Sequence, residues 1–168
     1  MSNAALKCSA EGVLLPLQKR QQAHDELSHR DILSFDLYKR LKHMVLHFYK
    51  YAGRIEVARS TGDLSQLRST LIDSFIICMA SANAMNLSLG EKISEIPESN
   101  DIDALARELG KTLQSTDLFA ESVRTLVILG GKMAKAIESA DHMERGDPRA
   151  DMESLVVQLT VAVLSILG

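Results

Sequence analysis

Apolar side chains recur at alternating steps of three and four residues along most of this chain. Two such stripes begin at Tyr38 and at Leu64. Steps of three and four bring side chains to one face of an α-helix, whereas a half-buried strand alternates at every second residue. The pattern therefore predicts two long amphipathic helices. The first stripe comprises Tyr38, Leu41, Val45, Phe48, Ala52 and Ile55, and the second comprises Leu64, Leu67, Leu71, Phe75, Cys78, Ala82, Met85 and Leu89.

Turn-forming residues separate these two stripes. The segment Ser60-Thr61-Gly62-Asp63 supplies a glycine, which ends helices in a left-handed conformation, and then an aspartate, which caps the first turn of a helix. A connection this short joins antiparallel neighbours. We therefore expect a helical hairpin.

The C-terminal part of the chain repeats this organisation. One helix is expected after Asn100 or Asp101, and another runs from Asp117 towards Glu144, where Gly130-Gly131 marks a kink or a close helix contact. Pro148, within Gly146-Asp147-Pro148, suits the first turn of a last helix. Their apolar positions are Ile102, Leu105, Leu109 and Leu113, then Phe119, Val123, Leu126, Met133 and Ile137, and finally Met152, Leu155, Leu159, Ala162 and Ile166.

These patterns together predict an all-α fold. One more helix, from Gly12 to Leu27, contains Pro16, and no run alternates in the manner of a strand. We expect a bundle of five to six helices in one domain, 1–168, because 168 residues suit a single core. The segment Glu95 to Asn100 contains Pro97 and predicts a linker between halves 10–95 and 101–168. Whether these halves are a tandem duplication of a helical hairpin stays open.

The composition favours a cytoplasmic protein. Two cysteines cannot form a disulfide scaffold, and the first ten residues lack the basic patch and apolar core of a signal peptide. The apolar stretch Leu155 to Leu167 is shorter than the roughly 20 residues that a spanning helix needs. We therefore expect no membrane association.

Charge is concentrated on one predicted helix. The 19 basic and 22 acidic residues give a net charge of −3, which offers no global reason to expect nucleic-acid binding. Between Asp36 and Arg59, however, six residues are basic and only two are acidic. This helix is expected to meet either an acidic partner, such as the segment from Glu138 to Glu153 or a second subunit, or an anionic ligand such as a phosphate.

Two histidines lie on the basic helix four residues apart, so that His43 and His47 share one face. This spacing can hold a metal ion between two imidazoles. Lys50 and Arg54 lie on the same side and bring positive charge, which favours a solvated or interface face instead. A metal pair would need Asp31, His29 or another subunit to complete it.

The segment from Phe48 to Ile93 contains five short sequence motifs in a fixed order. They are Lys50-Tyr51-Ala52-Gly53-Arg54, then Gly62-Asp63, then Thr70-Leu71-Ile72-Asp73, then the segment from Ala82 to Leu89, and lastly Glu91-Lys92-Ile93. This order resembles that of the MazG-like, all-α nucleoside triphosphate pyrophosphohydrolase superfamily, and it covers a little over a quarter of the chain.

The resemblance implies a magnesium site with an altered set of ligands. Family carboxylates bind Mg²⁺, which orients a water that cuts between the α- and β-phosphates. Here only Asp73 matches the acidic pattern, and Glu56 is the nearest other carboxylate, turned about 200° away on its helix. The family's glutamates are replaced by Lys50, Tyr51, Arg54 and Thr70.

Three functions follow as alternatives. The first is a MazG-like protein whose metal site is lost or rebuilt and which binds a nucleotide or other phosphate ligand through Lys50, Arg54, His47 and His43. The second is an active pyrophosphohydrolase with Mg²⁺ at Asp73, together with Glu56 or Asp31. The third is a helical interaction or adaptor protein without small-molecule chemistry. The family's habit of dimerising, together with the apolar C-terminal helix, predicts a homodimer.

Overall fold

The computed structural model describes residues 9–93 and 99–168, and these residues form eight helices and no strand. Six helices have nine residues or more, and α2 and α5 have four each. The all-α fold is therefore confirmed. In chain order the helices are α1 (Ala10–Ser28), α2 (Arg30–Leu33), α3 (Leu37–Thr61), α4 (Leu64–Ala84), α5 (Leu89–Lys92), α6 (Ile102–Gly110), α7 (Leu118–Asp141) and α8 (Pro148–Leu167).

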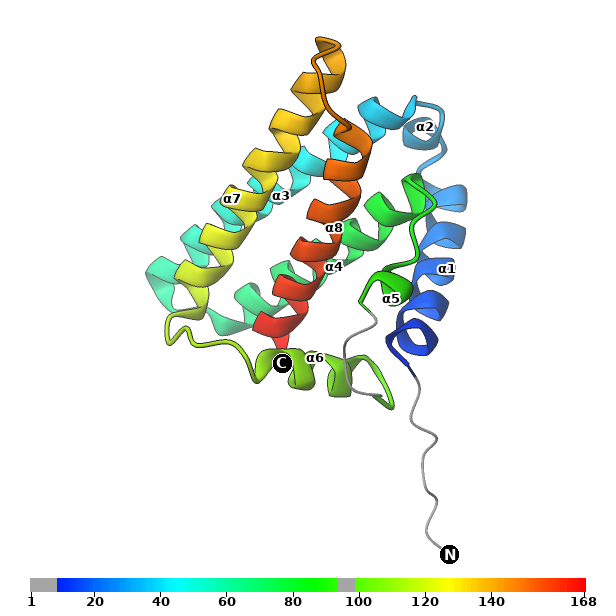
Figure 1. Ribbon diagram of the computed structural model, residues 1–168. Helices are drawn as coiled ribbons and strands as arrows, with labels where there is room; N and C mark the ends of the chain where they lie inside the picture. The colour runs from blue at the N-terminus through cyan, green and yellow to red at the C-terminus, as the bar shows by residue number, and fades with distance from the viewer. Residues whose placement is uncertain (1–8, 94–98) are drawn as a thin grey trace, which may run out of the picture.

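Four long helices pack in a closed ring that surrounds the core (Figure 1). Helix α3 packs against α4 and α7, and α8 packs against the same two helices from the other side. Thus α3 and α4 form one hairpin, and α7 and α8 form the second. Helix α1 lies outside this ring against α4 and α5, and α6 crosses the end of α8.

Aspartates fix where most of the long helices begin. The carboxylates of the residues before α3, α4, α6, α7 and α8 each accept a hydrogen bond from the backbone N–H three positions ahead. Such a cap satisfies one of the N–H groups that the first turn leaves unpaired. Gly62 ends α3 with φ of 67°, and Asp63 begins α4, so the expected hairpin turn is confirmed. The capping residues are Asp36, Asp63, Asp101, Asp117 and Asp147.

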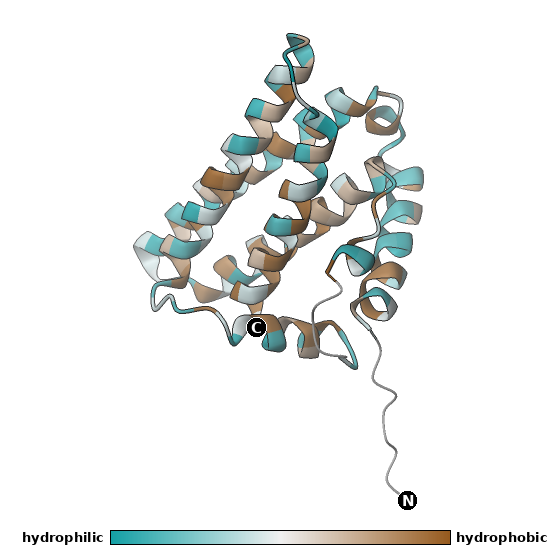
Figure 2. Ribbon diagram, in the orientation of Figure 1, coloured by the Kyte–Doolittle hydropathy of each residue, from teal (hydrophilic) through white to brown (hydrophobic). Residues whose placement is uncertain are grey.

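The core is formed by the apolar faces that the periodicity predicts, and Figure 2 shows apolar and polar positions alternating around the ring helices. Phe48, Ile55 and Leu71 are fully buried between the two hairpins, as are Leu126 and Leu159. Cys78 is equally buried, and burial raises the pKa of its thiol to about 12, so it is a core residue and not a reactive thiolate.

Gly130 and Gly131 do not interrupt α7, which is one continuous helix. A Cβ at Gly130 would lie 3.6 Å from the ring of Tyr49, and one at Gly131 would lie 3.3 Å from its hydroxyl. Of the two expectations for this pair, the close helix contact is therefore confirmed and the kink is not. Most of the expected linker, including Pro97, lies outside the described residues.

The C-terminal helix is longer than its apolar stretch indicates. Helix α8 has 20 residues, and among the described helices it is the one long and apolar enough to cross a membrane, with a mean hydropathy of 1.6. The expectation that it is too short to span was therefore wrong. Half of the apolar window of this helix is buried against its neighbours.

Two glycines provide a matched test of the packing. A Cβ at Gly90 would collide with the backbone of Glu11, which joins α5 to α1, whereas a Cβ at Gly53 meets nothing within 4 Å. We expect Gly90→Ala to lower the free energy of unfolding by about 1–3 kcal/mol, and Gly53→Ala to raise it by about 0.5–1 kcal/mol. Urea unfolding followed by circular dichroism measures both, and equal effects of the two substitutions would contradict the close approach of α5 to α1.

Candidate functional site

A pocket of about 610 Å³ opens between α1, α2, α3 and α4. We call it the α1–α3 pocket. Its size falls within the range of small-molecule binding sites. Four of the five histidines of the chain line it, together with two arginines and an apolar floor. The residues that define it are Leu17, Arg20, Gln21, Gln22, His24, Asp25, Glu26, His29, Ile32, Leu33, Arg40, His43, Met44, His47, Tyr51, Ile76, Ile77, Met79, Ala80, Asn83 and Ala84.

The pocket exists because α1 changes character half-way along. Up to Gln18 the helix carries buried residues, whereas from Lys19 to Ser28 it has none. Figure 2 shows the same change from apolar to polar positions along α1. The first half can therefore pack against the ring, and the second half stands over α3 and α4 without filling the space beneath it.

Buried hydrogen bonds of Gln18 hold the α1 wall in place. Its amide donates to the carbonyl of Leu87 at 2.9 Å and to the side chain of Asn83 at 3.1 Å. The backbone N–H of Leu89 donates to its side-chain oxygen at 2.9 Å, and Asn83 donates to its backbone carbonyl at 2.9 Å. Because Gln18 is only 4% exposed, these bonds fix α1 to α4 and α5.

The opposite wall is a polar stripe on α3. Its residues follow one another at steps of three or four and so share one face of the helix: Arg40, His43, His47 and Tyr51 line the pocket, and Arg54 continues the stripe beyond it. The Nε of Arg40 is buried and has no hydrogen-bond partner among residues 9–93 and 99–168. A buried donor without an acceptor costs about 1–3 kcal/mol, which a ligand acceptor would recover.

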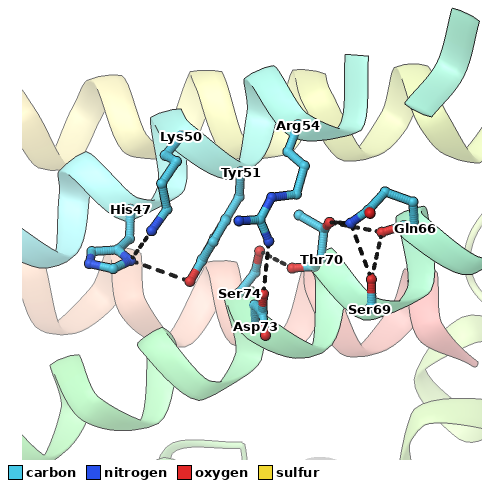
Figure 3. Close-up of polar contacts among 9 residues, drawn as sticks. All are labelled: His47, Lys50, Tyr51, Arg54, Gln66, Ser69, Thr70, Asp73 and Ser74. Carbon is cyan, nitrogen blue, oxygen red and sulfur yellow. Dashed lines mark hydrogen bonds and ion pairs between the residues drawn. The ribbon is translucent and has the colours of Figure 1, made fainter. Parts of the chain in front are cut away.

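The two histidines of α3 are in direct contact. Their Nε2 atoms lie 3.2 Å apart. Nδ1 of His47 lies 3.3 Å from the Tyr51 hydroxyl and 3.0 Å from Nζ of Lys50 (Figure 3). Since the Lys50 ammonium can only donate, it favours the His47 tautomer whose Nδ1 accepts and whose Nε2–H donates to His43. The result is a chain of hydrogen bonds in which Lys50 donates to His47 and His47 donates to His43, which lines the pocket.

Burial and charge both keep His47 neutral. Burial lowers its pKa from the usual value of 6.5, and the charges of Lys50, His43 and His29 lower it further, while Asp73 acts in the opposite direction. Burial also raises the pKa of Tyr51, and the Asp73 carboxylate adds to this effect. A neutral imidazole and a protonated phenol therefore line the wall at neutral pH.

Asp73 of α4 lies next to Arg54, a cation of the basic helix α3. Nη1 of Arg54 on α3 donates to its carboxylate across the hairpin at 3.1 Å, as Figure 3 shows. The guanidinium of Arg54 and the ammonium of Lys50 both lie over the Tyr51 ring, at 5.4 and 4.9 Å from its centroid. Lys50 and Arg54 therefore flank the pocket, whereas His43 and His47 line it.

Glu56 is placed away from Asp73. It follows Arg54 by two residues, which turns it about 200° around α3, and its carboxylate lies 3.6 Å from Arg59. The two carboxylates expected to share a metal therefore each pair with a different arginine.

The basic helix also meets part of the expected acidic segment. Lys42 lies 3.8 Å from Asp141, which belongs to that segment. Arg59 lies 3.2 Å from Asp117, which lies outside that segment and caps the start of α7. Glu138 and Glu144 instead pair with Lys135, which lies on α7 itself. Of the remaining cations of α3, Lys39 pairs with Asp36, Arg40 lines the pocket, and Lys50 and Arg54 flank it.

Sequence reasoning missed the contribution of α1. Ligand atoms of His24, Asp25 and His29 lie within 4.8 Å of one another at the pocket, and Arg40 is the cation buried there. His24 and His29 are five residues apart, which is not a helical neighbour spacing. The one signal that could have revealed them is the polar run that follows Gln18.

No family model, no curated protein and no solved structure matches this chain.

The lowered pKa of His47 predicts a loss of stability in acid. As the pH falls through 6.5, the unfolded chain takes up a proton that folded His47 resists, so the free energy of unfolding decreases. We expect the melting temperature to fall less between pH 7.5 and 5.5 in His47→Gln than in the unchanged protein. His142→Gln, at an exposed turn, serves as control and should keep the original pH dependence. Identical pH dependence in all three proteins would refute this assignment.

Proposed function

We propose that this chain is a cytoplasmic, MazG-like binding protein that holds a phosphate-bearing ligand, such as a nucleotide, in the α1–α3 pocket without a divalent cation at Asp73. The observation that carries the proposal is the buried, unpartnered Nε of Arg40. Arg40 lines a cavity of ligand size, and an anionic oxygen is the acceptor that a guanidinium binds most strongly.

The lining suits a ligand with one anionic and one apolar end. Arg20 and Arg40 supply charge, and His43 and His47 supply imidazole nitrogens. The floor is apolar and comes from α4 and from the first half of α1, as expected for the part of a site that covers a base or another flat apolar group. Its main residues are Leu17, Ile76, Ile77, Met79 and Ala80.

The ion pair between Arg54 and Asp73 supports binding over hydrolysis. A divalent cation at Asp73 would have to displace the guanidinium or lie against it. Like charges at that distance repel, which weakens a site that needs several carboxylates. The MazG resemblance therefore enters the proposal as a related fold whose magnesium site is lost.

Exchange of Arg40 tests the proposal. In EDTA, we expect nucleoside triphosphates to raise the melting temperature and to bind in isothermal titration calorimetry. Arg40→Met should weaken binding by about 10- to 100-fold, because it removes a charge-assisted hydrogen bond. It should leave the melting temperature of the free protein unchanged or higher, because it also removes an unpaired buried donor. Arg145→Met is the matched control, because Arg145 is exposed in the turn between α7 and α8 and does not line the pocket.

Three outcomes would contradict this proposal. The same affinity in Arg40→Met and in the control would exclude Arg40 as a ligand contact. No binding of any nucleotide tested would favour an adaptor, and release of pyrophosphate with Mg²⁺ that disappears in Asp73→Ala would favour a pyrophosphohydrolase.

We also propose that the protein is a homodimer, but through a different face from the one expected. Helix α8 is packed against α4, α6 and α7, whereas Leu46 and Val57 on the outer face of α3 are 61% and 71% exposed. Val127 and Ile128 of α7 are exposed as well. Because α3 and α7 pack against each other, we propose that these exposed apolar residues contribute to one interaction surface.

Light scattering tests the dimer. At micromolar concentration we expect twice the chain mass of 18.5 kDa. Val57→Asp should shift the mass to that of a monomer, because it places a charge in the apolar interface. Leu27→Asp, which changes an exposed leucine of α1, should remain dimeric. A monomeric unchanged protein would refute the proposal.

A further inference from the structure

We propose that His24, Asp25 and His29 bind a divalent transition-metal ion of the zinc class at the α1–α3 pocket. This site is separate from the proposed ligand contact at Arg40, and it is also separate from Asp73 and Glu56. Its three possible ligand atoms, two imidazole nitrogens and one carboxylate oxygen, all lie within 4.8 Å of one another.

The end of α1 brings these side chains together. His24 and Asp25 lie in the last turns of α1, and His29 follows directly after the helix, where its backbone N–H donates to the carbonyl of Asp25 at 2.8 Å. His29 is also the residue before α2. Held by both helices, it turns back so that its ring lies 5.6 Å from that of His24, centroid to centroid.

The distances suit a small coordination sphere. Zinc lies about 2.0–2.1 Å from imidazole nitrogen, so tetrahedral ligands are roughly 3.3 Å apart. Because the three ligand atoms already lie within 4.8 Å of one another, each pair needs to move closer by at most about 1.5 Å to bind zinc. His24 and His29 are exposed, so rotation of their side chains can supply this movement without disturbing the core.

A second interaction already orients the carboxylate. Nε2 of Gln21 donates to Oδ1 of Asp25 at 2.8 Å, which leaves the other oxygen for a metal. Outer hydrogen bonds of this kind fix the orientation of metal ligands.

The ligand set selects the class of metal. Two imidazoles and one carboxylate suit Zn²⁺, Co²⁺ and Ni²⁺, whereas Mg²⁺ prefers an all-oxygen shell. With three protein ligands, at least one coordination position remains for water or a bound ligand. All three residues line the pocket, so this position is reached from the cavity.

The pair His43 and His47 is the less suitable alternative, although its Nε2 atoms are only 3.2 Å apart. The Lys50 ammonium lies 3.0 Å from Nδ1 of His47, and a cation would meet that charge. The α1 cluster contains a carboxylate instead, and Glu26 adds a second acidic group at the pocket. The α3 pair therefore serves as an internal control.

The experiment titrates the full chain, free of metal and in phosphate-free buffer, with Co²⁺ and Zn²⁺. We expect one equivalent to bind, with a visible Co²⁺ spectrum of tetrahedral type, and Zn²⁺ to displace it. His29→Ala and Asp25→Asn should each weaken binding at least tenfold, and Gln21→Ala should weaken it about tenfold. His43→Asn should leave the affinity unchanged. Circular dichroism confirms that each variant is folded.

Several outcomes would overturn the site. These are no saturable binding, an octahedral spectrum unaffected by His29→Ala, or loss of binding in His43→Asn with retention in His29→Ala. The result is independent of nucleotide binding, because it is read from the metal spectrum without any phosphate ligand present.

Discussion

The rest of this structure depends on one constraint, which is the fixed orientation of α3 about its own axis. Leu41, Val45, Phe48 and Ile55 are almost completely buried between α4 and α7, so the helix cannot turn without exposing them. Because each residue advances about 100°, this burial also decides where every other side chain of α3 points. The stripe from Arg40 to Arg54 faces the pocket and α4, while Leu46 and Val57 face outward.

The same constraint distributes the charge of the basic helix. Lys42 and Arg59 pair with carboxylates of α7, and Arg54 pairs with Asp73 of α4. Exposed pairs of this kind contribute about 0–1 kcal/mol each, so their main consequence here is electrostatic. Arg40, whose Nε is buried without a partner among the described residues, is then the cation of α3 that lines the pocket. The small net charge of the chain thus conceals an uneven distribution of charge around this helix.

Much of the fold could be predicted because its signals are local. Helix periodicity, the capping aspartates and the turn at Gly62 each depend on neighbours within four residues. The adjacency of His43 and His47 could be predicted for the same reason. The ion pair of Arg54 with Asp73 could not, because it depends on how two helices are rotated against each other. The length of α8 was underestimated because its first turns are polar and its apolar stretch begins later.

The pocket follows from the difference between the apolar first half and the polar second half of α1. Ala10, Val13 and Leu14 bury apolar area against the ring, and the hydrogen bonds of Gln18 fix the helix at that point. Beyond Gln18 the side chains are too polar to bury, yet the helix continues for ten residues because its backbone hydrogen bonds are satisfied internally. A rigid polar segment is thereby held over an apolar floor. The histidines and carboxylates of this segment, His24, Asp25, Glu26 and His29, therefore line the pocket instead of being packed into the core.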